Sequence, residues 1–185
     1  MNPILRFTLA AAVCVLTTVA NAQTQPAGYV DFGKLSENTD GDSVEINIKG
    51  ALLAFAAKVA EKSEPKASEL LKNLQQVRVN VLKLNDKNRE QITERAKAIR
   101  AQLTSDKWEQ VVSVQDKKED VGVFVKMSAE AIQGLVVTVI DGAKEAVFVN
   151  IVGDIRADQL AEVAEQLNIE PLKKMTGKLK KSEKS

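Results

Sequence analysis

The chain has 185 residues, 26 basic and 25 acidic side chains, one cysteine and no histidine. Without imidazole there is no Ser-His-Asp arrangement and no histidine-based zinc or haem site, and the balanced charge gives no overall field to attract nucleic acid. The length suits one domain with its own hydrophobic core. We therefore expect a single domain that holds no cofactor and no metal and binds no nucleic acid.

Residues 1–22 have the features of a secretory signal peptide. Arg6 precedes an apolar run from Phe7 to Val19, and Ala20-Asn21-Ala22 provides a small-x-small cleavage site. The run is shorter than the roughly 20 residues that cross a bilayer, and Cys14 lies inside it rather than behind it, so it does not form a lipidation site. We expect cleavage after Ala22, with no lipid anchor and no transmembrane anchor. The mature protein would then be free of thiols and lie in the periplasm or outside the cell.

An N-terminal arm and loop are expected over residues 23–43. Residues 44–49 alternate apolar with polar side chains, which predicts a strand with one buried face, and Gly50 ends it. A helix is expected over residues 51–62, and a second one begins at Pro65. The apolar positions that these two helices are expected to bury are Leu52, Phe55, Ala56, Val59 and Ala60 in the first, and Leu70, Leu71 and Leu74 in the second.

The rest of the domain, taken as residues 44–168, continues with a second alternating strand at 77–84. A charged helix follows over 86–103, with an apolar stripe of Ile92, Ala96, Ile99 and Leu103. Four strands with short connections (111–115, 121–127, 135–140, 146–152) and a last helix (156–167) complete it. These elements predict an α+β domain: a largely antiparallel sheet with a C-terminal four-strand meander, and amphipathic helices packed mainly on one face.

The parity of the strand residues divides the sheet into two faces. The valine-rich positions, such as Val44, Val79, Val123 and Val149, form the face that we expect the helices to cover. The opposite face mixes aromatic with polar side chains and is a candidate interaction surface: Phe124, Phe148, Asn47, Asn80, Asn150, Thr138 and Lys126. It would suit an extended peptide, a glycan or a second copy of the chain. In the alternative interpretation, the segment from Tyr29 to Phe32 or another loop covers both phenylalanines and makes a second small core.

The last residues, 169–185, form a basic tail that is expected to be disordered. Its lysines either solubilise the chain end or contact anionic envelope polymers and lipid headgroups. The candidate anion contacts are Lys173, Lys174, Lys178, Lys180, Lys181 and Lys184.

Motifs for catalysis are missing from the sequence. No two glycines form the G-x-G of a nucleotide-binding loop. Asp40 and Asp42 suggest a calcium loop, but Ser43 and Lys49 stand where its glycine and glutamate belong. We therefore predict a non-enzymatic binding module that uses a sheet face or edge to hold an unidentified envelope protein or polymer. The alternatives are a carboxylate-based hydrolase of envelope polymers and an accessory to envelope stress signalling.

Four short motifs carry a family resemblance. They are Tyr29 to Gly33, Val44 to Gly50 before a helix with two leucines, Val77 to Val81, and Asn150 to Ile155 before the last helix. With them, nearly the whole mature chain resembles the DUF4252 family. The resemblance implies an exported bacterial protein of uncharacterised function, and it supplies no catalytic residues. Members of this family are often predicted lipoproteins, and this chain departs from them because it has no usable lipidation site.

Overall fold

The computed structural model describes residues 25–35, 42–116, 119–129, 131–142, 144–156 and 159. The expected signal peptide, nearly all of the expected last helix and the lysine tail lie outside these residues. The described strands are β1 (Ser43–Lys49), β2 (Leu74–Lys83), β3 (Glu109–Gln115), β4 (Glu119–Met127), β5 (Ile132–Asp141) and β6 (Glu145–Ile155). The described helices are α1 (Gly50–Ala60), α2 (Pro65–Asn73) and α3 (Arg89–Ser105).

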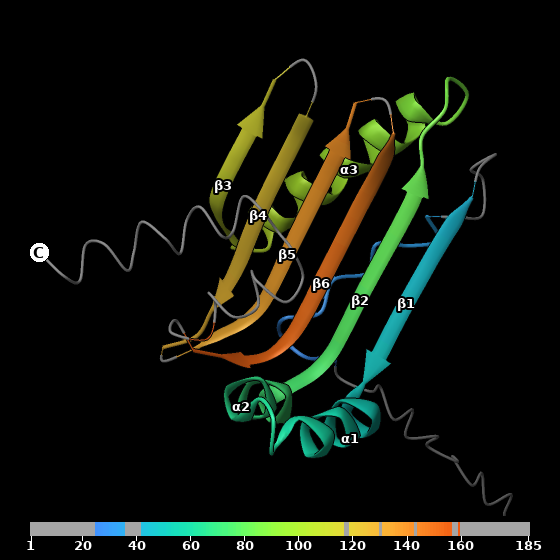
Figure 1. Cartoon of the computed structure of the whole chain (residues 1–185). Coiled ribbons are helices and arrows are strands. Elements are labelled where there is room, and N and C mark those ends of the chain that lie inside the picture. The colour runs from blue at the N-terminus through green and yellow to red at the C-terminus, as the bar shows by residue number, and fades with distance from the viewer. Residues whose placement is uncertain are drawn as a thin grey trace, which may run out of the picture.

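All six strands form one open antiparallel sheet in the order β1-β2-β6-β5-β4-β3 (Figure 1). This confirms the expected α+β class with an antiparallel sheet. β3 to β6 are neighbours in chain order because short turns join them. For example, the Lys144 amide donates to the Asp141 carbonyl at 3.0 Å beside Gly142, a residue type that favours such turns. β2 lies between β1 and β6, so it joins the first part of the chain to the last strand.

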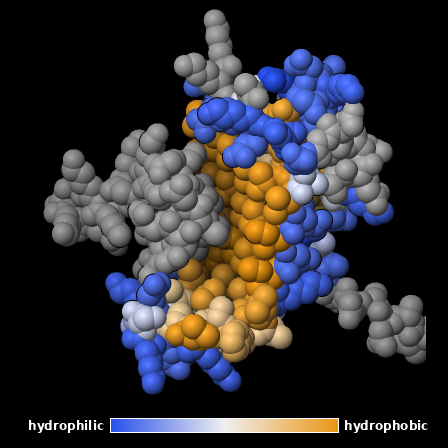
Figure 2. Space-filling view, turned by 45° about the vertical axis from the view of Figure 1, so that its right-hand side comes forward, coloured by the Kyte–Doolittle hydropathy of each residue, from blue (hydrophilic) through white to orange (hydrophobic). Residues whose placement is uncertain are grey.

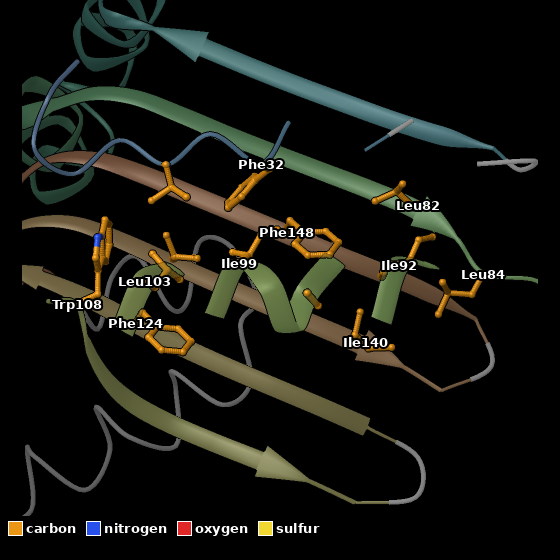
Figure 3. Packing of buried hydrophobic residues seen from close by; sticks show 14 residues of the cluster. Phe32, Leu82, Leu84, Ile92, Ile99, Leu103, Trp108, Phe124, Ile140 and Phe148 are labelled. Carbon is orange, nitrogen blue, oxygen red and sulfur yellow. The ribbon is translucent and has the colours of Figure 1, made fainter. Parts of the chain in front are cut away.

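Helix α3 packs behind the sheet, against the face that carries Phe124 and Phe148 (Figure 1, Figure 3). Its predicted stripe is confirmed, because these side chains are only 1–3 % exposed: Ile92, Ala96, Ile99 and Leu103. Asn88 fixes the start of the helix. Its side-chain oxygen accepts a hydrogen bond from the Asn85 amide at 2.8 Å, and its side-chain nitrogen donates to the Lys83 carbonyl at 2.9 Å. The helix is therefore tied to the end of β2.

The N-terminal segment, residues 25–35, lies on the same face as α3. The rings of Phe32 and Phe148 are 5.8 Å apart between centroids, and both are fully buried. The buried side chain of Asn150 on β6 accepts from the Val30 amide at 3.0 Å and donates to the Gly28 carbonyl at 2.9 Å. The segment is held by apolar contact and by paired backbone groups, so it forms part of the core.

Helices lie on both faces of the sheet, so the expected packing mainly on one face holds only in part. Leu53 of α1 and Leu70 of α2 belong to a second cluster of buried residues, which lies on the valine-rich face. Both helices sit at the lower end of the sheet in Figure 1, and α2 is joined to α1 by the Ser68 hydroxyl, which donates to the Ala57 carbonyl at 2.8 Å. The fold thus has helical cover on both faces, and on the valine-rich face α1 and α2 are at one end.

Gly28 allows the N-terminal segment to approach β5 closely, because a Cβ atom at this position would overlap the backbone of Gln133. We expect Gly28→Ala to lower the free energy of unfolding by about 1–3 kcal/mol, the usual cost of overpacking. The matched control is Gly50→Ala, where the nearest atom would be the Gln75 oxygen at 4.0 Å. Urea unfolding followed by circular dichroism measures both, and equal midpoints for the two variants would contradict this view of the segment.

Candidate functional site

The predicted aromatic and polar surface is buried rather than open, which corrects the interpretation of these residues as a docking platform. Phe124, Phe148, Thr138 and Asn150 are at most 1 % exposed, and Asn80 is 6 % exposed. The reason is that α3 and residues 25–35 cover this face. Of the remaining predicted residues, Asn47 is exposed, and Lys126 is half-buried and donates a hydrogen bond to the Asp106 carbonyl.

The polar groups of the covered face are used to attach the cover. Arg100 of α3 donates from Nε to the Thr138 hydroxyl at 2.9 Å, and its Nη1 pairs with the Asp120 carboxylate at 2.6 Å. Both charged side chains are less than one-fifth exposed. A paired, hydrogen-bonded arginine of this kind fixes the position of a helix on a sheet.

The alternative interpretation, in which the N-terminal segment covers the phenylalanines, agrees with the structure for Phe148, whose buried ring lies against that of Phe32.

The opposite, valine-rich face consists of apolar rows that cross the sheet. One row runs through all six strands from β1 to β3 and contains Val44, Val81, Val147, Val139, Val121 and Val114. The next contains Ile46, Val79, Val149, Val137, Val123 and Val112. Burial differs along each row: Val121 and Val123 are fully buried, whereas Val44 is 56 % and Ile46 is 44 % exposed. Figure 2 shows a hydrophobic band that runs along this face of the sheet.

Helix α1 adds exposed apolar side chains at the lower end of this band. Leu52, Phe55 and Val59 are 56 %, 64 % and 65 % exposed and, at spacings of three and four, lie on one side of the helix. The helix instead buries Leu53 and Ala57. The expectation that Leu52, Phe55 and Val59 are buried is therefore wrong. Val44, Ile46, Leu52, Phe55 and Val59 are called the open apolar surface below.

Strand β1 forms one edge of the sheet and exposes backbone hydrogen-bonding groups. The Lys83 amide donates to the Asp42 carbonyl at 2.9 Å, in line with the β1–β2 register. Because antiparallel pairs alternate between hydrogen-bonded and non-hydrogen-bonded, the backbone groups of the even-numbered residues point to β2. Those of Glu45, Asn47 and Lys49 point outward and pair with no other strand among the described residues, and these groups are called the free β1 edge.

The other edge strand, β3, is irregular. Its register with β4 shifts between Gln110 and Val112, which leaves Val111 as an extra residue in a β-bulge. Bulges of this kind discourage another strand from pairing with an edge. β1 pairs with β2 over all seven of its residues without a shift. Of the two edges, β1 is thus the one suited to accept a further strand.

A polar hollow of about 430 Å³ lies on the covered face beside β1, next to the N-terminal segment. Arg78 on its wall is 7 % exposed. It donates from Nη1 to the Tyr29 hydroxyl at 3.1 Å and lies 3.5 Å from the Glu45 carboxylate and 3.9 Å from that of Asp31. Two carboxylates that lie close to one guanidinium act as its counter-ions. The geometry of the hollow is that of an anchor for the N-terminal segment.

The residues that the structure describes contain no group of three or more acidic, cysteine or histidine side chains that could hold a metal ion. Over the same residues no helix is both long and apolar enough to cross a bilayer. On the outer surface of α3, a hydrogen bond to the Glu94 carboxylate raises the pKa of Lys97, and both side chains are exposed. The candidate lysines of the tail lie outside the described ranges.

Comparison with curated proteins and with solved structures gives no match. A family model described as a domain of unknown function (DUF4252) matches residues 36–163. That range covers more than half of the chain and includes every described strand and helix. The chain therefore belongs to the DUF4252 family.

Proposed function

We propose that this protein is a non-enzymatic interaction module of the cell envelope, which binds a protein partner through the open apolar surface and the free β1 edge. The exposure of the open apolar surface carries the proposal, because its five large side chains are 44–65 % exposed. Soluble monomers rarely expose contiguous apolar patches beyond a few hundred Å², and such patches commonly serve binding. The export features of residues 1–22 supply the envelope location in this proposal.

The partner chemistry follows from the free β1 edge. An extended segment can add to β1 as a further strand, with its backbone groups paired to those of Glu45, Asn47 and Lys49. Val44 and Ile46 lie on one side of β1, so a partner strand with apolar residues at every second position would extend the apolar rows. Main-chain pairing would supply affinity and the apolar side chains would supply selectivity.

Site-specific photo-crosslinking in cells tests the proposal. A photoreactive phenylalanine analogue at position 55 is expected to yield a covalent adduct, whereas the same analogue at exposed Lys97 on α3 is not. Adding Ile46→Lys should reduce the adduct at position 55 by about tenfold, since the partner would have to bury a charge. Circular dichroism checks that this variant folds.

The identity of the adduct is read by mass spectrometry. Adduct yields that are equal at positions 55 and 97, or that Ile46→Lys leaves unchanged, would contradict a specific interaction through this surface.

A further inference from the structure

We propose that the partner is a second copy of this chain, and that the two β1 strands pair antiparallel about a two-fold axis at Asn47. The inference rests on the proposed function, because it names the occupant of the free β1 edge and of the β1 part of the open apolar surface. The pairing would join two six-stranded sheets into one continuous sheet. Its support comes from the direction of the backbone groups, the charges on β1 and the position of its apolar side chains.

The backbone groups permit this pairing. With the axis at Asn47, Asn47 lies opposite its own equivalent, and Glu45 lies opposite Lys49 of the second copy, once on each side of the axis. All three residues have outward-pointing backbone amides and carbonyls, as the Asp42–Lys83 hydrogen bond implies. Each opposing pair can therefore exchange two hydrogen bonds without breaking any bond between β1 and β2.

The charges select this axis among the available ones. An axis at Glu45 would place that carboxylate opposite its own copy, and an axis at Lys49 would do the same for the ammonium, so both would be repulsive. An axis at Ile46 would set Glu45 opposite an asparagine and Lys49 opposite a serine, without a counter-charge. Only the axis at Asn47 pairs Glu45 with Lys49 twice across the interface. Opposite charges directly across two strands stabilise their pairing.

The apolar side chains fit the same axis. A two-fold axis perpendicular to the sheet keeps the valine-rich faces of both copies on one side. Ile46 then lies opposite Ile48 of the second copy in a non-hydrogen-bonded pair, the type in which side chains approach most closely. Val44 lies opposite Gly50, where α1 of the second copy begins. The pairing thus covers Ile46, which is 44 % exposed in the single chain, and continues the apolar rows across the axis.

Sedimentation velocity of the purified protein, expressed from the full-length sequence, tests the dimer. The wild type is expected to sediment with the mass of two chains. Asn47→Pro removes an outward amide on the axis, and proline is tolerated on an edge strand where its nitrogen faces away from the sheet. Lys49→Glu places two carboxylates opposite each other at both ends of the interface. We expect each change to raise the dissociation constant of the dimer by about tenfold or more.

One further variant completes the design. Lys58→Glu on the exposed surface of α1 makes the same charge change away from the edge and should leave the dimer intact. Circular dichroism and thermal unfolding check that every variant is folded.

A folded wild type with the mass of one chain, or a Lys49→Glu variant that dimerises as tightly as the wild type, would overturn the inference. The crosslinking experiment separates this failure from failure of the proposed function. A one-chain mass together with an adduct between position 55 and a different protein leaves the interaction module standing and overturns only the second-copy assignment.

Discussion

Phe148→Ala is expected to lower the free energy of unfolding by about 3–5 kcal/mol, the usual cost of removing a buried phenylalanine ring. Phe148 is fully buried, and its ring contacts Phe32 of the N-terminal segment. The matched control is Phe55→Ala on α1, whose side chain is 64 % exposed. That change is expected to stay within about 0.5 kcal/mol of the wild type, as surface substitutions do.

Urea unfolding followed by fluorescence of Trp108 and by circular dichroism measures both variants. If Phe148→Ala is as stable as Phe55→Ala, the aromatic face is not the core. If Phe55→Ala is the more damaging change, the assignment of Phe55 to the exposed side of α1 is wrong.

Asn150→Ala is expected to release the N-terminal segment and to lower the free energy of unfolding by about 2–4 kcal/mol, because removing its side chain leaves buried backbone groups unsatisfied. The Val30 amide would lose its acceptor at 3.0 Å, and the Gly28 carbonyl would lose its donor at 2.9 Å. Hydrogen exchange reports this loss directly, since the Val30 amide should change from protected to rapidly exchanging.

Asn73→Ala, at the exposed end of α2, is the matched control and should leave both stability and exchange near wild type. Retained protection of Val30 in the Asn150→Ala variant would show that this side chain does not hold the segment in place.

Sequence patterns predicted the sets of residues that share a strand face, but not which face the helices cover. Alternation in residues 44–49 and 77–83 correctly grouped the valines and isoleucines, and the structure aligns these groups into rows. The periodicity of a strand does not show which other part of the chain packs on each of its faces, however. The aromatic face is buried because α3 and residues 25–35 lie on it, and that arrangement depends on contacts between distant parts of the chain.

The two long predicted helices show when a helical stripe is informative. The stripe of α3 was predicted correctly because charged side chains surround Ile92, Ala96 and Ile99 and leave only one apolar side. Helix α1 is apolar on nearly every side, so several stripes fit its sequence equally well. The structure buries Leu53 and Ala57 and exposes Phe55, a choice that the spacing alone could not make.

The free β1 edge was also beyond prediction from the sequence. The sequence predicts binding through a sheet face or edge, but it does not show which strand is the edge. That depends on the pairing of β2 with β6, which residues 84–144 separate along the chain. Once the strand order is known, Glu45, Asn47 and Lys49 become significant, because their backbone groups face outward.

Hydroxyl-radical footprinting of the phenylalanines at positions 32, 55, 124 and 148 compares the two surfaces in one experiment. In the structure, α3 and residues 25–35 bury the aromatic face, whereas α1 and β1 present an open apolar surface. The account predicts rapid oxidation of Phe55 in the folded protein and oxidation near background at Phe32, Phe124 and Phe148. Oxidation of Phe124 and Phe148 as rapid as that of Phe55 would contradict it.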